Sequence, residues 1–137
     1  MQRIIQQEFY NKPIQANRLY PDNYQVISCF INKKLFSAGT SDTAIPLDYS
    51  EVEGILSKFQ VKKNRMNRDI SGTTYILFEF SDSNRPNKLP LLYVFNDGRI
   101  WLAKDNRQET LSYELVGEQK DALYLELMEM ISQKEDK

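Results

Sequence analysis

Runs of apolar residues along the chain predict several β-strands. These runs, rich in β-branched and aromatic side chains, occupy residues 24–31, 35–39, 73–80 and 111–116. In TTYILFEF at 73–80, Ile76, Phe78 and Phe80 share one face, because successive side chains of a strand point to opposite sides. The pattern therefore predicts a sheet with at least one apolar face.

The stretch LLYVFNDGRIWL at 91–102 predicts a β-hairpin, because Asn-Asp-Gly between two apolar runs is a strong turn signal. Two registers are open. A two-residue turn pairs Val94 with Trp101. A three-residue loop, with Gly98 in the left-handed region, shifts the pairing by one residue. In either register both faces of the hairpin are apolar.

Helical spacing of apolar residues predicts three helices, at 2–10, 48–59 and 118–132. Asp48 and Glu51 have the spacing of a capping box at the start of the second helix. Gly54 lies inside this helix and costs about 1 kcal/mol relative to alanine, so we expect close packing at this position.

The order of these elements predicts an α+β fold. The chain shows no regular alternation of strands and helices that would support a parallel sheet. We expect an antiparallel sheet of about five strands, with two main helices packed on one face and a short N-terminal helix. A length of 137 residues is within the usual size of one domain, so residues 1–137 are predicted to form a single unit.

Charge and cysteine content limit which partners are expected and whether a disulfide can stabilise the fold. With 18 basic and 19 acidic residues, the formal net charge of −1 gives no overall footprint for nucleic acid or for an anionic membrane. Cys29 is the single cysteine, so an intrachain disulfide cannot form. No apolar run reaches the length of a membrane span, and the start lacks the apolar region of a signal peptide. The sequence as it stands predicts a cytoplasmic protein, or an extracytoplasmic one if it is a mature fragment whose signal has been removed.

The chain lacks most of the residues that catalysis and cofactor binding use. It contains no histidine, and its one cysteine and five glycines match no thiolate metal site or phosphate-binding loop. We therefore expect no enzyme activity, no metal and no cofactor. The alternative is a small enzyme that uses a buried carboxylate, and Glu79, between two phenylalanines of a strand, is the candidate general acid.

A basic segment at 58–68 gives a second alternative, nucleic-acid binding. Its candidate contact residues are Lys62, Lys63, Arg65 and Arg68. No aromatic residue interleaves these charges and no known nucleic-acid-binding motif surrounds them, so this role is disfavoured. We interpret the basic segment and an acidic excess at 114–137 as two solvated faces that lie near one another.

The doubly apolar hairpin is the main candidate for binding another protein. One of its faces meets the helices, and the other needs a cover: the N-terminal helix, a second layer or another molecule. A contiguous apolar patch and a tryptophan are typical of interaction sites. The candidate contact residues are Trp101, Leu92, Val94 and Arg99.

Residues 45–132 contain, in this order, IPLDYSEVEGIL, YILFEF, VFNDGRIWL and GEQKDALYLELMEMI. In this order of patterns the chain resembles the small extracytoplasmic domains of Gram-positive bacterial lipoproteins that have no assigned function. It departs from them in lacking a signal and a lipobox, and the resemblance carries no functional residues across. We predict a non-catalytic protein-interaction module of a bacterial accessory system, of the immunity, inhibitor or envelope-associated type.

Overall fold

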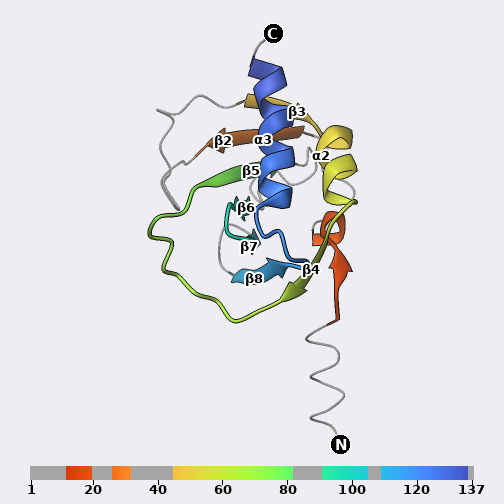
Figure 1. The fold of residues 1–137 in the computed structure, drawn as a ribbon. Helices are drawn as coiled ribbons and strands as arrows, with labels where there is room; N and C mark the ends of the chain where they lie inside the picture. Colours follow the sequence, from red (N-terminus) through yellow and green to blue (C-terminus); the bar gives the residue numbers. More distant parts are fainter. Residues whose placement is uncertain (1–11, 20–25, 32–44, 82–90, 105–108, 136–137) are drawn as a thin grey trace, which may run out of the picture.

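The computed structural model of the chain describes residues 12–19, 26–31, 45–81, 91–104 and 109–135 (Figure 1). Eight strands form one antiparallel sheet in the order β1-β4-β8-β7-β6-β5-β2-β3. The strands are β1 (Ile14–Gln15), β2 (Val26–Ile31), β3 (Ile45–Asp48), β4 (Gln60–Lys63), β5 (Tyr75–Ser81), β6 (Leu91–Phe95), β7 (Arg99–Lys104) and β8 (Glu109–Leu115). The helical elements are the 3-10 turn η1 (Ala16–Leu19) and the α-helices α2 (Tyr49–Leu56) and α3 (Ala122–Glu135).

The predicted fold was wrong in its strand count and in the elements with which its described part begins. The sheet has eight strands and not about five, and the chain is mostly β. The helix predicted at 2–10 and the strand predicted at 35–39 lie outside the described residues. The first described elements are instead β1 and a 3-10 turn, which directly follow Pro13 and occupy a segment without helical or strand periodicity.

The strongest sequence signals gave correct elements. Strands β2, β5 and β8, the β6–β7 hairpin, and helices α2 and α3 all lie where their apolar patterns predict them. Gly54 is an exception within α2, because it is exposed and a Cβ atom there would have no neighbour within 4 Å. The expectation of close packing at Gly54 was therefore wrong. None of the helices in the described ranges combines the length and apolar character that crossing a membrane requires.

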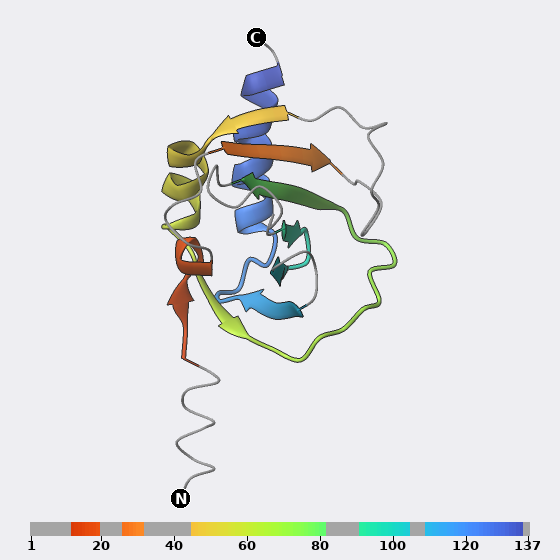
Figure 2. The same cartoon turned by 180° about the vertical axis from the view of Figure 1, so that it is seen from behind.

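One face of the sheet packs against both α-helices. Figure 1 shows α3 running across this face with α2 beside it, and Figure 2 shows the strands from the opposite side. Alternate strand residues such as Phe78, Leu92 and Leu102 meet helix residues in one buried cluster. The helices supply Val52, Leu56, Leu123, Leu127 and Ile131 to it. The main core therefore lies between the sheet and the helices.

The other face of the central strands carries a second buried cluster, which we call the aromatic face. It consists of Tyr75, Leu77, Leu91, Tyr93, Phe95, Trp101 and Ala103. Met66 and Ile70, from the connector between β4 and β5, pack against it. Phe95 and Trp101 meet edge to face with ring centroids 4.7 Å apart. The central strands are therefore buried on both sides.

The hairpin adopts the three-residue alternative. Tyr93 pairs with Trp101 and Val94 with Ile100, one residue away from the two-residue register. Gly98 has a φ of +96°, and its N–H donates to the carbonyl of Phe95 at 3.3 Å. Glycine suits this turn because it adopts positive φ without the steric cost that a Cβ atom brings.

Candidate functional site

The structure does not bring the apolar partner-binding candidates together on one surface. Leu92 and Val94 belong to the cluster beneath the helices, whereas Trp101 belongs to the aromatic face. Residues directly opposite in an antiparallel pair share a face, so the observed pairing of Trp101 with Tyr93 causes this separation. Trp101 is only 2% exposed, and Leu92 and Val94 are also buried. These three side chains build the two cores.

Arg99, the fourth candidate, binds the chain's own connector. Its Nη1 donates to the backbone carbonyls of Asn67 at 2.9 Å and Asp69 at 2.7 Å. Its Nη2 lies 2.8 Å from Asp97 Oδ2, and its guanidinium carbon lies 5.4 Å from the centroid of the Phe95 ring. The side chain is 14% exposed. Arg99 therefore ties residues 64–74 to the hairpin.

The basic candidates are distributed over two elements. Lys62 and Lys63 are successive residues of β4, and Lys62 lies 3.6 Å from Glu114 of β8. Arg65 and Arg68 are exposed in the connector that follows. A second ion pair joins Lys58 to Glu126 of α3 at 3.0 Å. The basic and acidic segments therefore lie side by side, as their charges predict, and part of the basic charge is neutralised within the chain.

Glu79, the candidate acid, lies in β5 opposite Ser28 of β2 and Leu91 of β6. It is half-buried, and it occupies the same side of the strand as Tyr75 and Leu77. Within the described ranges, no group of three or more histidine, cysteine or acidic residues is placed so that it could hold a metal ion. A catalytic role of Glu79 stays a prediction.

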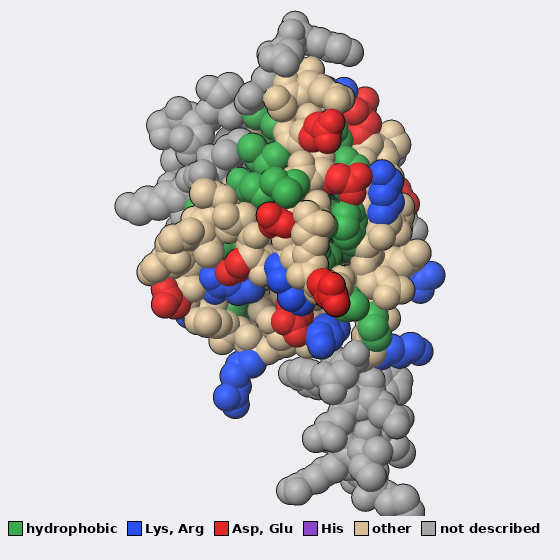
Figure 3. Space-filling view, viewed as in Figure 1, with side chains coloured by type: hydrophobic (Ala, Val, Ile, Leu, Met, Phe, Trp, Pro, Cys, Tyr) green, Lys and Arg blue, Asp and Glu red, His purple; other side chains and the backbone are tan. Residues whose placement is uncertain are grey.

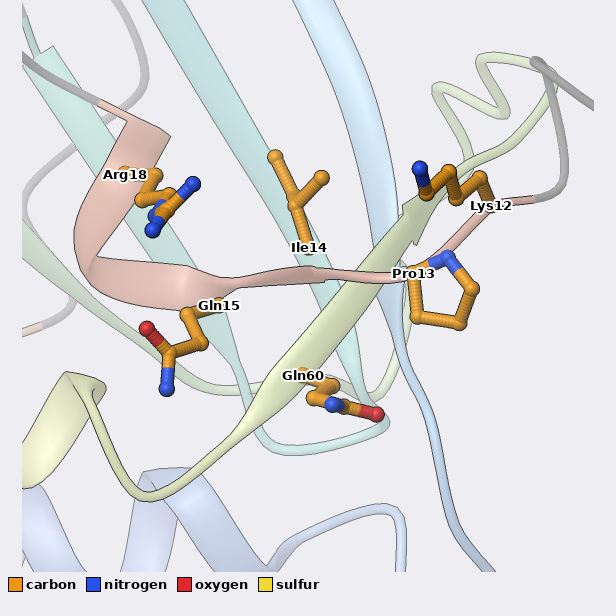
Figure 4. Close-up of a pocket in the computed structure, with 6 residues that line it drawn as sticks. All are labelled: Lys12, Pro13, Ile14, Gln15, Arg18 and Gln60. Atoms are coloured by element: carbon orange, nitrogen blue, oxygen red, sulfur yellow. The ribbon is translucent and has the colours of Figure 1, made fainter.

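A different site emerges at the edge of the sheet, and we call it the edge surface. It is an open depression of about 620 Å³ around β1, lined by Lys12, Pro13, Ile14, Gln15, Arg18 and Gln60 (Figure 4). Ile14 is 36% exposed, one of the few large apolar side chains that the described surface presents. In Figure 4, Lys12 and Arg18 lie on either side of Ile14 and extend to the same side of the strand.

The electrostatic character of the edge surface is basic. No acidic residue is among the described residues that line it, and neither Lys12 nor Arg18 forms an ion pair with any of the residues that the structure describes. Figure 3 shows hydrophobic and basic side chains together at the lower right, where β1 lies in Figure 1. An apolar side chain flanked by two cations that have no acidic partner among the described residues suits a ligand that is both apolar and acidic.

Pairing within the sheet positions this site. Ile14 lies opposite Val61, and the N–H of Ala16 donates to the carbonyl of Phe59 at 3.0 Å. Hydrogen-bonded and non-hydrogen-bonded pairs alternate in an antiparallel ladder, so the backbone N–H and C=O of Gln15 point away from β4. Because β1 ends the strand order, these groups face the outer edge of the described sheet.

Sequence reasoning missed the edge surface because it has no local signature. Residues 12–18 have no periodic apolar pattern, and their two cations are separated in the sequence. Pro13 within this segment and Pro21 shortly after it are typical of a loop. The site forms when this segment pairs with β4, whose residues come more than forty positions later in the chain. One signal was present: an isolated isoleucine directly after a proline, in a segment otherwise polar.

Comparison with known proteins adds no functional residue. Searches against protein-family models, curated proteins and solved structures found no match to the chain. The resemblance to lipoprotein domains therefore stays a prediction.

Proposed function

We propose that the protein is a non-catalytic protein-interaction module that binds an acidic, partly apolar segment of another protein at the edge surface. The observation that carries this proposal is the exposed Ile14 between two cations, Lys12 and Arg18, that have no acidic partner among the described residues. An immunity or inhibitor protein of a bacterial accessory system is its most concrete form.

The chemistry of recognition follows from the side chains. A partner that covers Ile14 removes apolar surface from water, which favours association by about 25 cal/mol per Å² of apolar area. Carboxylates of the partner placed near Lys12 and Arg18 would accelerate association and fix its orientation. The outward backbone groups of Gln15 supply one further donor and one acceptor for an extended segment. The strand is only two residues long, so side chains and not a long ladder dominate the contact.

The proposal is tested with a library of displayed extended peptides, selected on the wild-type protein. We expect the selected peptides to be enriched in acidic residues next to aliphatic ones. Their affinity should fall about tenfold or more in the double variant Lys12→Glu/Arg18→Glu, and it should weaken as salt is added.

The matched control is Arg65→Glu/Arg68→Glu, which makes the same change in net charge on exposed arginines of the β4–β5 connector. Peptide affinity should be unchanged in this control. Equal loss in both variants, or selection of peptides without acidic residues, would contradict a specific contact at the edge surface.

A further inference from the structure

The connector between β4 and β5 has an unusual path. Strands β8, β7 and β6 lie between β4 and β5 in the sheet, so residues 64–74 must cross three strands to join them. In Figure 2 this segment passes around the outside of β8, β7 and β6. We call residues 64–74 the strap.

The strap touches the aromatic face through few side chains. Met66 and Ile70 pack against it, and both are half-buried, whereas all seven residues of the aromatic face are buried. The remaining residues of the strap are polar or glycine. The apolar contact that holds the strap is therefore small compared with the surface that it helps to cover.

Hydrogen bonds attach the strap at its two ends. At its start, the N–H of Asn64 donates to the carbonyl of Ser112 at 3.2 Å, and the Ser112 hydroxyl donates to Asn64 Oδ1 at 2.6 Å. At its end, Thr74 and Asn96 exchange two hydrogen bonds, of 2.9 and 3.3 Å. Between these ends, Arg99 is the one sheet side chain that bonds the strap's backbone in the described structure.

The middle of the strap is bonded largely to itself. The N–H of Asp69 donates to Asn67 Oδ1, and the N–H of Ser71 donates to Asp69 Oδ1, each at 3.1 Å. Hydrogen bonds from Ser71 hold the pKa of the Asp69 carboxyl below its usual value. The N–H and the hydroxyl of Thr73 both donate to the carbonyl of Ile70. These hydrogen bonds lie within the strap and do not involve the sheet, so detaching the strap from the sheet would not require breaking them.

The surface beneath the strap contains an unsatisfied donor. Nε1 of Trp101 is buried and has no hydrogen-bond acceptor in the described structure. A buried N–H without an acceptor costs free energy that water would recover on exposure. Opening the strap therefore relieves part of the cost of exposing the tryptophan ring.

We infer that the strap is a releasable cover, that the Arg99 guanidinium is its latch, and that release uncovers the aromatic face while the sheet stays folded. Asp97 positions the latch through its two contacts with the guanidinium, at 2.8 and 2.9 Å. The device gives the protein two surface states, one with Trp101 covered and one with it open to solvent. It is independent of the edge surface and of the function proposed there.

The test compares Arg99→Ala with Arg68→Ala, which removes an exposed arginine from the strap itself. Trp101 is the single tryptophan, so acrylamide quenching reports its exposure alone. We expect quenching in Arg99→Ala to rise several-fold while circular dichroism stays that of the wild type, and quenching in Arg68→Ala to stay unchanged. Unchanged quenching in Arg99→Ala would overturn the latch.

Native-state hydrogen exchange of the wild-type protein keeps the inference testable if Arg99→Ala does not fold. The amides of Asp69, Ser71 and Thr73 should exchange through local opening, well before those of β6 and β7. Exchange of the strap only together with β6 and β7 would show that the aromatic face opens by global unfolding, and would overturn the releasable cover.

Discussion

At the residue scale, Glu51 shows how one side chain joins two helices that cover the sheet. Its Oε1 lies 2.7 Å from Nζ of Lys134, so the contact links the first turn of α2 to the last turn of α3. Lys134 is the main cause of a lowered pKa of Glu51, and Glu51 in turn raises the pKa of Lys134. Both side chains are about one-third exposed, so solvent screens the pair.

The Glu51 pair predicts a specific pH dependence of stability. Because the folded pKa of Glu51 lies below its ordinary value of 4.5, the pair stabilises the protein above that pH. Its contribution is lost as the pH falls through the lower, folded pKa. Glu51→Gln should therefore lower the urea midpoint near neutral pH, and the difference from wild type should vanish in acid.

Glu53→Gln is the matched control, since it changes the next glutamate of α2, for which the described structure shows no ion pair. Its urea midpoint should follow that of the wild type from neutral to acidic pH. A difference between Glu51→Gln and wild type that persists in acid would contradict an electrostatic origin.

At the element scale, the length of an apolar run decides which elements the sequence predicts. The long runs of β5 and of the β6–β7 hairpin predict strands clearly, because β-branched and aromatic residues continue over many positions and turn residues separate the two strands of the hairpin. Strands β1 and β4 have two and four residues, and QVKK of β4 has a single aliphatic residue. Such strands exist because a neighbour pairs with them, and tertiary pairing is not encoded locally.

The same limit explains why the edge surface could not be predicted from the sequence. The basic segment could be found because its charges are adjacent in sequence, whereas Lys12 and Arg18 are separated and come together only around β1. The sequence shows that both faces of the hairpin are apolar, but it does not show which segment covers the second face. Met66 and Ile70 stand alone in a polar connector, and only the strand order places that connector over the aromatic face.

Substituting alanine for Gly98 in the hairpin turn and for Gly54 in α2 should change stability in opposite directions. Gly98 has a φ of +96°, and an added Cβ would lie 3.2 Å from atoms of Lys120. Gly98→Ala should therefore lower the free energy of unfolding by about 1–3 kcal/mol, since the strained backbone adds to the close contact. Chemical denaturation followed by circular dichroism measures this change.

Gly54→Ala is the comparison variant for this prediction. Gly54 lies inside α2, where a Cβ would meet nothing within 4 Å. Alanine there should raise the free energy of unfolding by about 0.5–1 kcal/mol, because it restricts the unfolded chain and favours the helix. If both alanine variants changed the free energy of unfolding in the same direction, the positive φ of Gly98 could not be the cause of its effect.

At the scale of the whole molecule, the central strands of the sheet lie between two buried clusters. Strands β5, β6 and β7 send alternate side chains into the main core and into the aromatic face. Among the described residues, the two sides differ in what packs against them. Two helices contribute buried side chains on one side, and the strap contributes the half-buried Met66 and Ile70 on the other. On this asymmetry rests the inference that the strap side opens locally while the helix-covered side stays folded.

The helix-covered side predicts a large difference between two leucines of α3. Leu127 is fully buried against the sheet, whereas Leu125 is 48% exposed. Leu127→Ala should lower the free energy of unfolding by about 2–5 kcal/mol, since it removes buried apolar area and leaves a cavity. Leu125→Ala makes the same chemical change and should cost less than about 0.5 kcal/mol. Denaturation monitored by circular dichroism and by Trp101 fluorescence should give the same ranking, because unfolding of the main core also exposes the aromatic face. Equal costs for the two variants would mean that α3 does not dock on the sheet in solution.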